Sequence, residues 1–230
     1  GNESLYGIFG TGADDVWIVG GSGTVLHKSG GMLTKMTQTA TTQVLYSIWG
    51  TGGTLYAVGT GGTLLKYDGT TFTASKIAGA EILTSVVGTG PNNIFVGSLS
   101  GSIRRSTDGT TINTVQICTT VPSPDPPIGC QAFNPFGINA LFASGTDVFA
   151  VGDVVYTDSL NKDATHRHGT LKKWDGSMFQ EVPGSPPVAF YGIWGTSASS
   201  LYMVGASGTI VQYNGSAHVS SSPVDLMTGI

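Results

Sequence analysis

The sequence repeats one pattern of apolar residues and glycines five times, with a period of about 40 residues. In its clearest form the pattern reads Leu-Tyr-Ser-Ile-Trp-Gly-Thr over 45–51, Leu-Tyr-Ala-Val-Gly over 55–59 and Gly-Thr-Leu-Leu-Lys-Tyr-Asp-Gly over 62–69. A repeat of this length that contains several short strands is typical of one blade of a β-propeller. The repeats run at about 5–44, 45–82, 83–137, 138–189 and 190–225.

Each repeat contains four segments that we expect to be strands. The first segment, such as 46–49, is apolar almost throughout, which is typical of a strand covered on both faces. Glycine pairs such as Gly59 and Gly62, and the Asp-Gly dipeptide at 68–69, favour tight turns between the later strands. The sequence therefore predicts an all-β, five-bladed β-propeller of four-stranded antiparallel blades, formed as a single domain over 1–230.

Two further features bear on this fold. The segment 226–230 resembles the start of a further repeat, so the alternative is that the chain is part of a larger propeller. Three tryptophans, Trp17, Trp49 and Trp194, lie at or beside the expected inner strands, and we expect all three to be mostly buried.

The composition excludes some classes of partner. Charged residues make up only 10% of the chain, below the average of about 25%, and the net charge is −4. Nucleic-acid binding needs clustered Lys and Arg. The basic pairs Arg104-Arg105 and Lys172-Lys173 lie in expected strands, where adjacent residues point to opposite faces and form no patch. No apolar run approaches the roughly 20 residues that span a membrane, so we expect no membrane insertion. The neutral, Gly-, Ser- and Thr-rich composition favours an extracellular or cell-surface location, with the periplasm as a further option, and leaves the oligomeric state open.

Two cysteines, Cys118 and Cys130, flank the proline-rich segment 119–129. Cysteines that bracket a loop of this kind suggest a disulfide, and hence an oxidising compartment. The alternative is a pair of free thiols in a cytosolic loop.

The motifs I-W-G-T, D-V-W-x-V-G and G-T-I-x-x-Y-D-G resemble a family of bacterial surface and secreted β-propeller repeats. The sequence is also distantly similar to Asp-box and photosystem-assembly-factor propellers through Ser-Thr-Asp-Gly-Thr-Thr at 106–111, although Ile112 stands where their motif has Trp. Tachylectin-type propellers are similar in size and blade number only. No sugar-contacting residue can therefore be transferred from them.

Two insertions interrupt the period around the fourth repeat. Gly20, Gly59 and Gly97 are 39 and 38 residues apart, whereas Gly97 and Gly152 are 55 apart. The additional residues lie around 118–135, before the fourth blade, and a second insertion follows at 153–168, between its second and third strands. Alternating strand directions place both insertions at the same face of the propeller. Long loops on a rigid scaffold often carry function, but insertions can also be tolerated without any role.

These insertions, with the residue directly after the first one, supply the predicted ligand-binding residues, which combine aromatic rings with groups that can bind hydroxyls: Phe133, Phe136, Tyr156, Asp158, His166 and His168. His166 and His168 alternate in an extended segment, and with Asp163 they form a weak candidate for a divalent metal site. The alternative interpretation is that they are ordinary polar loop residues.

No motif for nucleophilic or glycosidase chemistry is present, so we expect neither enzyme activity nor a cofactor. The sequence favours a secreted or cell-surface recognition module that binds carbohydrate, as a lectin or adhesin. The alternative is a protein-interaction or structural propeller of a larger surface protein. A third hypothesis is an enzyme with its site on the loop face of the fourth blade. The expected partner is therefore a glycan or a surface protein.

Overall fold

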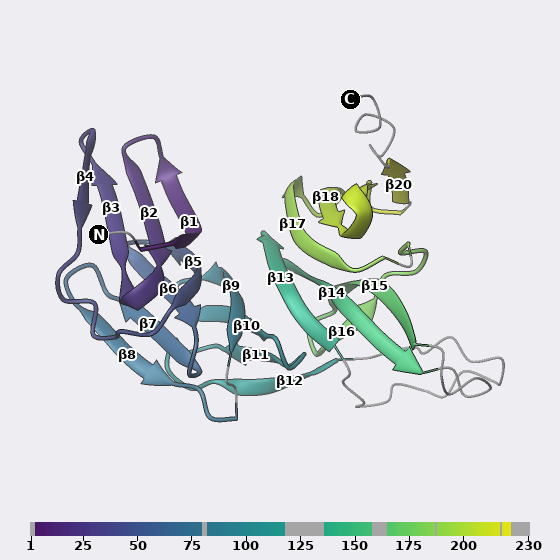
Figure 1. Ribbon diagram of the computed structural model, residues 1–230, viewed down its shortest axis with the longest axis horizontal. Helices are drawn as coiled ribbons and strands as arrows, with labels where there is room; N and C mark the ends of the chain where they lie inside the picture. Colours follow the sequence, from purple (N-terminus) through teal and green to yellow (C-terminus); the bar gives the residue numbers. More distant parts are fainter. Residues whose placement is uncertain are drawn as a thin grey trace. The chain divides into compact units, whose positions relative to one another are not determined.

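The computed structural model describes residues 3–79, 82–117, 136–157, 165–186, 188–216 and 218–221. Across these ranges the chain forms β-strands and two short 3-10 turns, and no α-helix (Figure 1). The strands form five four-stranded antiparallel blades, which confirms the predicted fold class. No helix in the described ranges is long and apolar enough to cross a membrane.

The strands of each blade follow one another along the chain. Blade one contains β1 (Leu5–Gly12), β2 (Asp15–Gly20), β3 (Val25–Ser29) and β4 (Met32–Lys35). Blade two contains β5 (Leu45–Thr51), β6 (Thr54–Gly59), β7 (Thr63–Tyr67) and β8 (Phe72–Lys76). Blade three contains β9 (Leu83–Gly90), β10 (Asn93–Ser98), β11 (Ile103–Ser106) and β12 (Asn113–Ile117). Blade four contains β13 (Phe136–Ser144), β14 (Asp147–Thr157), β15 (Thr165–Trp174) and β16 (Met178–Glu181). Blade five contains β17 (Phe190–Ser197), β18 (Ser200–Gly205), β19 (Ile210–Tyr213) and β20 (His218–Ser221).

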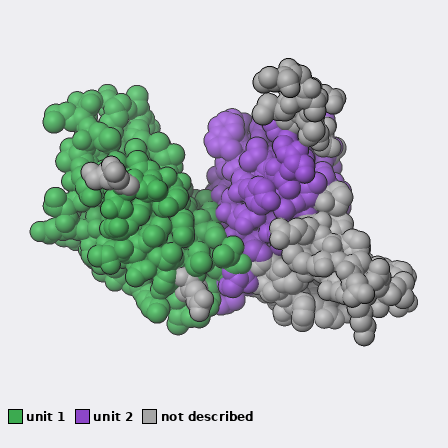
Figure 2. Space-filling model, viewed as in Figure 1, with its two compact units in different colours: residues 1–99, 104–113 green, residues 100–103, 114–230 purple. Residues whose placement is uncertain are grey.

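The chain divides into two compact units (Figure 2). The first unit consists of residues 1–99 with 104–113, and so holds blades one and two and most of blade three. The second consists of residues 100–103 with 114–230, and holds blades four and five together with most of β12. Within the second unit β12 pairs in parallel with β16, an exception to the antiparallel pairing inside the blades.

The Asp-Gly dipeptides form the tight turns that the sequence predicts. The Oδ1 atom of Asp68 accepts hydrogen bonds from the backbone amides of Thr70 and Thr71, each at 2.8 Å. These bonds hold the pKa of the Asp68 carboxyl well below its usual range. Gly69 takes a left-handed φ of 98°, which favours glycine. Asp108 and Asp175 accept equivalent amide bonds, so the repeated aspartates are turn residues.

Each blade has two faces, because successive residues of a strand point to opposite sides of the sheet. We call the face toward the preceding blade the N-side face and the face toward the following blade the C-side face. In blade two the N-side face carries Ile48, Leu55, Ala57 and Leu65, which form a core cluster with blade one. The C-side face carries Tyr56, Val58 and Leu64, which form a cluster with blade three. Both faces are apolar because both are covered.

The three tryptophans differ in burial. Trp17 is buried, as predicted, on the C-side face of blade one. Trp49 is half-buried, and its indole lies over Gly88 of blade three, where a Cβ would overlap the ring. The prediction that Trp194 is buried is wrong, since 63% of it is exposed. Trp194 lies on the C-side face of blade five, which no described strand of the second unit covers.

The second insertion, expected as a loop, is largely a hairpin. β14 continues to Thr157 and β15 begins at Thr165, with these two residues paired at the end of the ladder. The run Val-Val-Tyr-Thr at 154–157 explains the extension, because β-branched and aromatic residues favour strands.

Candidate functional site

Several residues of the predicted site lie outside the described residues: Cys118, Cys130, Phe133, Asp158 and Asp163. The disulfide, and the roles proposed for these side chains, therefore stay predictions. The structure places the backbones of the others on the strands of blade four. Phe136 begins β13, Tyr156 lies near the end of β14, and His166 and His168 lie near the start of β15.

Strand register brings these backbone positions together. Phe136 pairs with Val154, Val154 with His168, and Tyr156 with His166. The start of β13, the end of β14 and the start of β15 therefore lie at one end of blade four. Both insertions leave the blade at this end, in agreement with the strand directions. The pairing brings the predicted positions together without testing whether they bind a ligand.

A different site is formed in the first unit by blades one and two. It is an open pocket of about 850 Å³. One wall is the 3-10 turn η1 (Gly21–Gly23), which joins the second and third strands of blade one. The other wall is the connection 36–43, which leads from blade one into blade two. The pocket thus uses the same two kinds of loop that the sequence singled out in blade four, but on different blades.

Close backbone packing builds the pocket. The amide of Gly23 donates to the carbonyl oxygen of Gln43 at 2.8 Å. Gly23 has a φ of 68°, and a Cβ there would collide with the carbonyl of Thr41, so only glycine fits this approach. The hydroxyl of Thr60 in blade two donates to Oε1 of Gln43 at 2.8 Å, and this bond holds the Gln43 side chain in place. Ala40 also has a left-handed φ of 57°, a conformation that is costly for a residue with a Cβ.

Hydroxyl and amide groups dominate the lining of this pocket. Lys35 is the only charged residue among the lining residues, and none of them is aromatic. Thr37, Gln38 and Thr42 are exposed, and their side chains make no hydrogen bond to any described residue. The hydroxyl of Thr24, which is buried, also has no hydrogen-bond partner among the described residues. The exposed side chains of Thr37, Gln38 and Thr42 are free to bind a polar, uncharged ligand.

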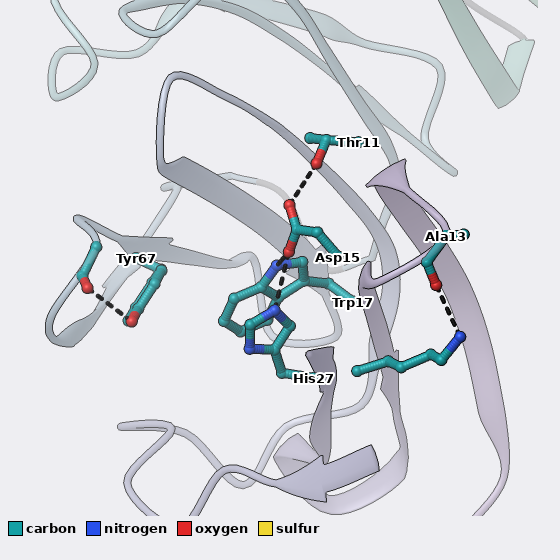
Figure 3. Close-up of polar contacts among 8 residues, drawn as sticks. Thr11, Ala13, Asp15, Trp17, His27 and Tyr67 are labelled. Carbon is teal, nitrogen blue, oxygen red and sulfur yellow. Dashed lines mark hydrogen bonds and ion pairs between the residues drawn. The ribbon is translucent and has the colours of Figure 1, made fainter. Parts of the chain in front are cut away.

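A second polar cluster lies in blade one around Asp15 (Figure 3). Its Oδ1 atom accepts hydrogen bonds from Nε1 of Trp17 at 3.0 Å and from Nε2 of His27 at 2.9 Å. The hydroxyl of Thr11 donates to the other carboxylate oxygen. The bond from Thr11, followed by that from His27, lowers the pKa of Asp15.

In this cluster the His27 side chain also packs against an aromatic ring. The His27 ring stacks on Trp17 with centroids 3.7 Å apart and planes 12° apart. The Thr11 hydroxyl donates to Asp15 and not to His27, so the imidazole activates no nucleophile here. This stacking makes His27 a packing residue of blade one. Sequence reasoning missed the bond to Asp15, although alternation along β2 and the pairing of Trp17 with His27 place all three side chains on one face.

No group of three or more His, Cys, Asp and Glu side chains that could hold a metal ion is present in the described part of the chain. The weak metal candidates His166, His168 and Asp163 are not tested by this result. Their side chains lie outside what the structure describes.

No family model matches the sequence, and no curated protein matches it. Among solved structures, the chain is similar to β-propellers of two kinds. One is YCF48 bound to a D1 peptide, with a TM-score of 0.64 and 15% identity, over 97% of this chain and 70% of that chain. The other is the WD40 β-propeller domain of Doa1, with a TM-score of 0.62 and 11% identity, over 93% of this chain and 66% of that chain.

These similarities confirm a distant relation in fold to known β-propellers. At these identities they show the fold alone. The specific resemblance to bacterial surface repeats stays a prediction.

Proposed function

We propose that this chain is a protein-interaction propeller that binds an extended polypeptide segment in the pocket formed by η1 and residues 36–43. The observation that carries the proposal is the set of side-chain hydroxyl and amide groups in that pocket without partners among the described residues. The pocket is open, so that a segment of chain could lie across it rather than be enclosed.

The chemistry of the lining suits a peptide backbone. An extended segment presents alternating N–H donors and C=O acceptors. The hydroxyls of Thr37 and Thr42 can both donate and accept, and the Gln38 amide offers one acceptor and two donors. Met36 adds an adaptable apolar contact for a side chain of the partner. A similar propeller, YCF48, has been solved with a peptide bound, which supports this class of ligand.

Carbohydrate binding is the competing function. Hydroxyl-rich pockets can bind neutral sugars, and the composition of the chain led to that hypothesis. The described lining, however, contains no aromatic side chain on which a sugar ring could stack. We therefore place the lectin or adhesin hypothesis second, and an enzymatic role third. An extracellular or cell-surface location is also part of the proposal, and mass spectrometry of the unreduced protein tests it through the predicted bond between Cys118 and Cys130.

Paired arrays test the proposed function. The wild-type protein is applied to an array of immobilised unstructured peptides and to a glycan array, beside two variants. Thr42→Trp fills the pocket from an exposed position, and Thr73→Trp makes the same change at an exposed position on β8. We expect peptides to be bound by the wild type and Thr73→Trp, and lost by Thr42→Trp. Binding to glycans alone, or peptide binding by Thr42→Trp equal to the wild type, would contradict the proposal.

A further inference from the structure

The tight turn after the third strand has a similar sequence in blades two, three, four and five. In the first three of these turns a glycine follows an aspartate, at Asp68, Asp108 and Asp175. Blade five has asparagine instead, at Asn214-Gly215, and this is the only asparagine of the chain that a glycine follows. The turn of blade five therefore carries a neutral amide where its equivalents carry a carboxylate.

The Asn214 turn has the geometry of the aspartate turn in blade two. Its Oδ1 atom accepts hydrogen bonds from the backbone amide and the hydroxyl of Ser216, at 3.1 and 3.2 Å. Asp68 accepts the same two bonds from Thr70, at 2.8 and 2.7 Å. The glycines that follow have φ angles of 97° in blade five and 98° in blade two. In both turns the preceding tyrosine hydroxyl donates to the glycine carbonyl oxygen. An aspartate at position 214 therefore fits the backbone as it stands.

The turn is open to water because of its place in the blade. Asn214 is exposed, and so are its equivalents Asp68 and Asp175. Asp68 belongs to blade two, whose two faces are both covered by neighbouring blades. The exposure of this turn therefore does not depend on whether a blade lies beside it.

An exposed asparagine followed by glycine can react with its own backbone. The Gly215 nitrogen attacks Cγ of Asn214, and the side-chain amino group leaves as ammonia together with the proton of the Gly215 amide. The product is a cyclic imide. Water then adds across the bond between Cγ and the Gly215 nitrogen, so that the hydroxyl joins Cγ, the hydrogen joins the nitrogen, and aspartate results. Because Gly215 has no Cβ, no side chain shields its nitrogen and its backbone rotates easily.

The two donor groups of Ser216 favour both steps. Negative charge develops on Oδ1 of Asn214 whenever a nucleophile adds to Cγ, and both groups already donate to this oxygen. In the second step they direct water to Cγ, which restores the normal main chain. Water that added to the backbone carbonyl instead would give isoaspartate, whose main chain is longer by one carbon atom and does not fit the turn.

We propose that Asn214 is a site of spontaneous deamidation, and that the folded turn converts it to aspartate rather than isoaspartate. Water is the only co-reactant. The reaction makes the net charge of −4 one unit more negative and gives blade five the carboxylate turn of blades two to four. A carboxylate accepts stronger hydrogen bonds than an amide oxygen does, so the modified turn is the more stable one. The site lies outside the pocket proposed to bind a peptide.

Peptide mapping by mass spectrometry tests the proposal on the full chain, incubated at mildly alkaline pH. We expect the peptide that contains Asn214 to gain the mass difference between a hydroxyl and an amino group, and to elute with a synthetic aspartate standard rather than an isoaspartate standard. Asn92 is exposed but is followed by Asn93, so it is the internal control and should stay unmodified. A sample unfolded in guanidinium chloride should give a larger share of isoaspartate at position 214.

Two variants test the role of the turn. Ser216→Ala removes one donor to Oδ1, so its folded chain should deamidate more slowly, whereas a turn that reacts only through loss of structure would deamidate faster. Asn214→Asp, shown to be folded by far-UV circular dichroism, should unfold at a higher urea concentration than the unmodified wild type. The proposal would be overturned by a folded chain that stays unmodified while the unfolded chain reacts, or by equal shares of isoaspartate in both. Equal or faster reaction of Ser216→Ala, or an Asn214→Asp variant no more stable than the wild type, would also overturn it.

Discussion

Two tyrosines at the same position of the repeat should differ greatly in their contribution to stability. Tyr56 and Tyr202 both lie on the second strand of a blade and both face the C-side. Tyr56 is fully buried against blade three, and its hydroxyl donates to the carbonyl oxygen of Pro91 at 2.9 Å. Tyr202 is 41% exposed. The substitutions Tyr56→Ala and Tyr202→Ala remove the same atoms from these two environments.

The magnitude follows from the buried area. A fully buried tyrosine removes about 200 Å² from water, which at about 25 cal/mol per Å² corresponds to about 5 kcal/mol. Tyr202 buries roughly three-fifths of that area, which corresponds to about 3 kcal/mol. The lost hydrogen bond to Pro91 adds about 1 kcal/mol to the cost at Tyr56. Tyr56→Ala should therefore lower the free energy of unfolding by about 3 kcal/mol more than Tyr202→Ala.

Urea denaturation followed by circular dichroism measures both losses. Tyr56→Phe serves as an internal control, because it removes only the hydroxyl and should cost about 1 kcal/mol. Equal losses for the two alanine variants would refute the assignment of a covered face in blade two and a bare face in blade five.

Three further predictions concern ionisable groups. Burial lowers the pKa of His218, so as the pH falls through about 6.5 the unfolded chain takes up a proton before the folded chain does. The free energy of unfolding, measured by urea titration, should therefore fall between pH 7.5 and 5.5. The same dependence of that free energy on pH in His218→Gln would contradict this. Burial lowers the pKa of Lys172 to about 8, and the Glu181 carboxylate 3.8 Å away offsets part of this effect. At pH 7 the variant Lys172→Leu should unfold at a urea concentration equal to or higher than that of the wild type, and this difference should shrink as the pH rises above 8. A marked loss of stability in the variant would contradict this. The hydrogen bonds from Thr11 and His27 lower the pKa of Asp15, so the stabilisation that the carboxylate provides is present above pH 4 and is lost as the pH falls. Because the group is partly exposed, Asp15→Asn should lower the free energy of unfolding by only about 1 kcal/mol at neutral pH. No loss in thermal or urea melts would show that the cluster is not stabilising.

The fold could be predicted from the sequence because its signals are local and repeated. The glycine of each tight turn and the Asp-Gly dipeptide specify turns within a few residues, as the Asp68 turn shows. The apolar first strand of each repeat indicates cover on both faces, and Ile48 is buried accordingly. Five copies of the same signals agree with one another, so that a weak copy does not change the conclusion.

The pocket could not be predicted in the same way. Residues 36–43 contain no apolar alternation and no glycine, so the sequence does not reveal that they fold against η1. The left-handed backbone of Ala40 is likewise unexpected for a residue with a Cβ. The exposure of Trp194 was missed because its local pattern is the same as that of Trp49. Trp49 differs in lying over the next blade of its own unit, and the sequence pattern around the residue carries no information about that cover.

The most direct test of the proposed function is to map where a bound peptide contacts the protein. A peptide selected on the array is titrated into ¹⁵N-labelled protein, and the amide shifts are followed by NMR. The account predicts that the shifts cluster at residues 22–24 and 35–43 and disappear in Thr42→Trp. Shifts confined to β13–β15 of blade four, or spread evenly over the five blades, would contradict it.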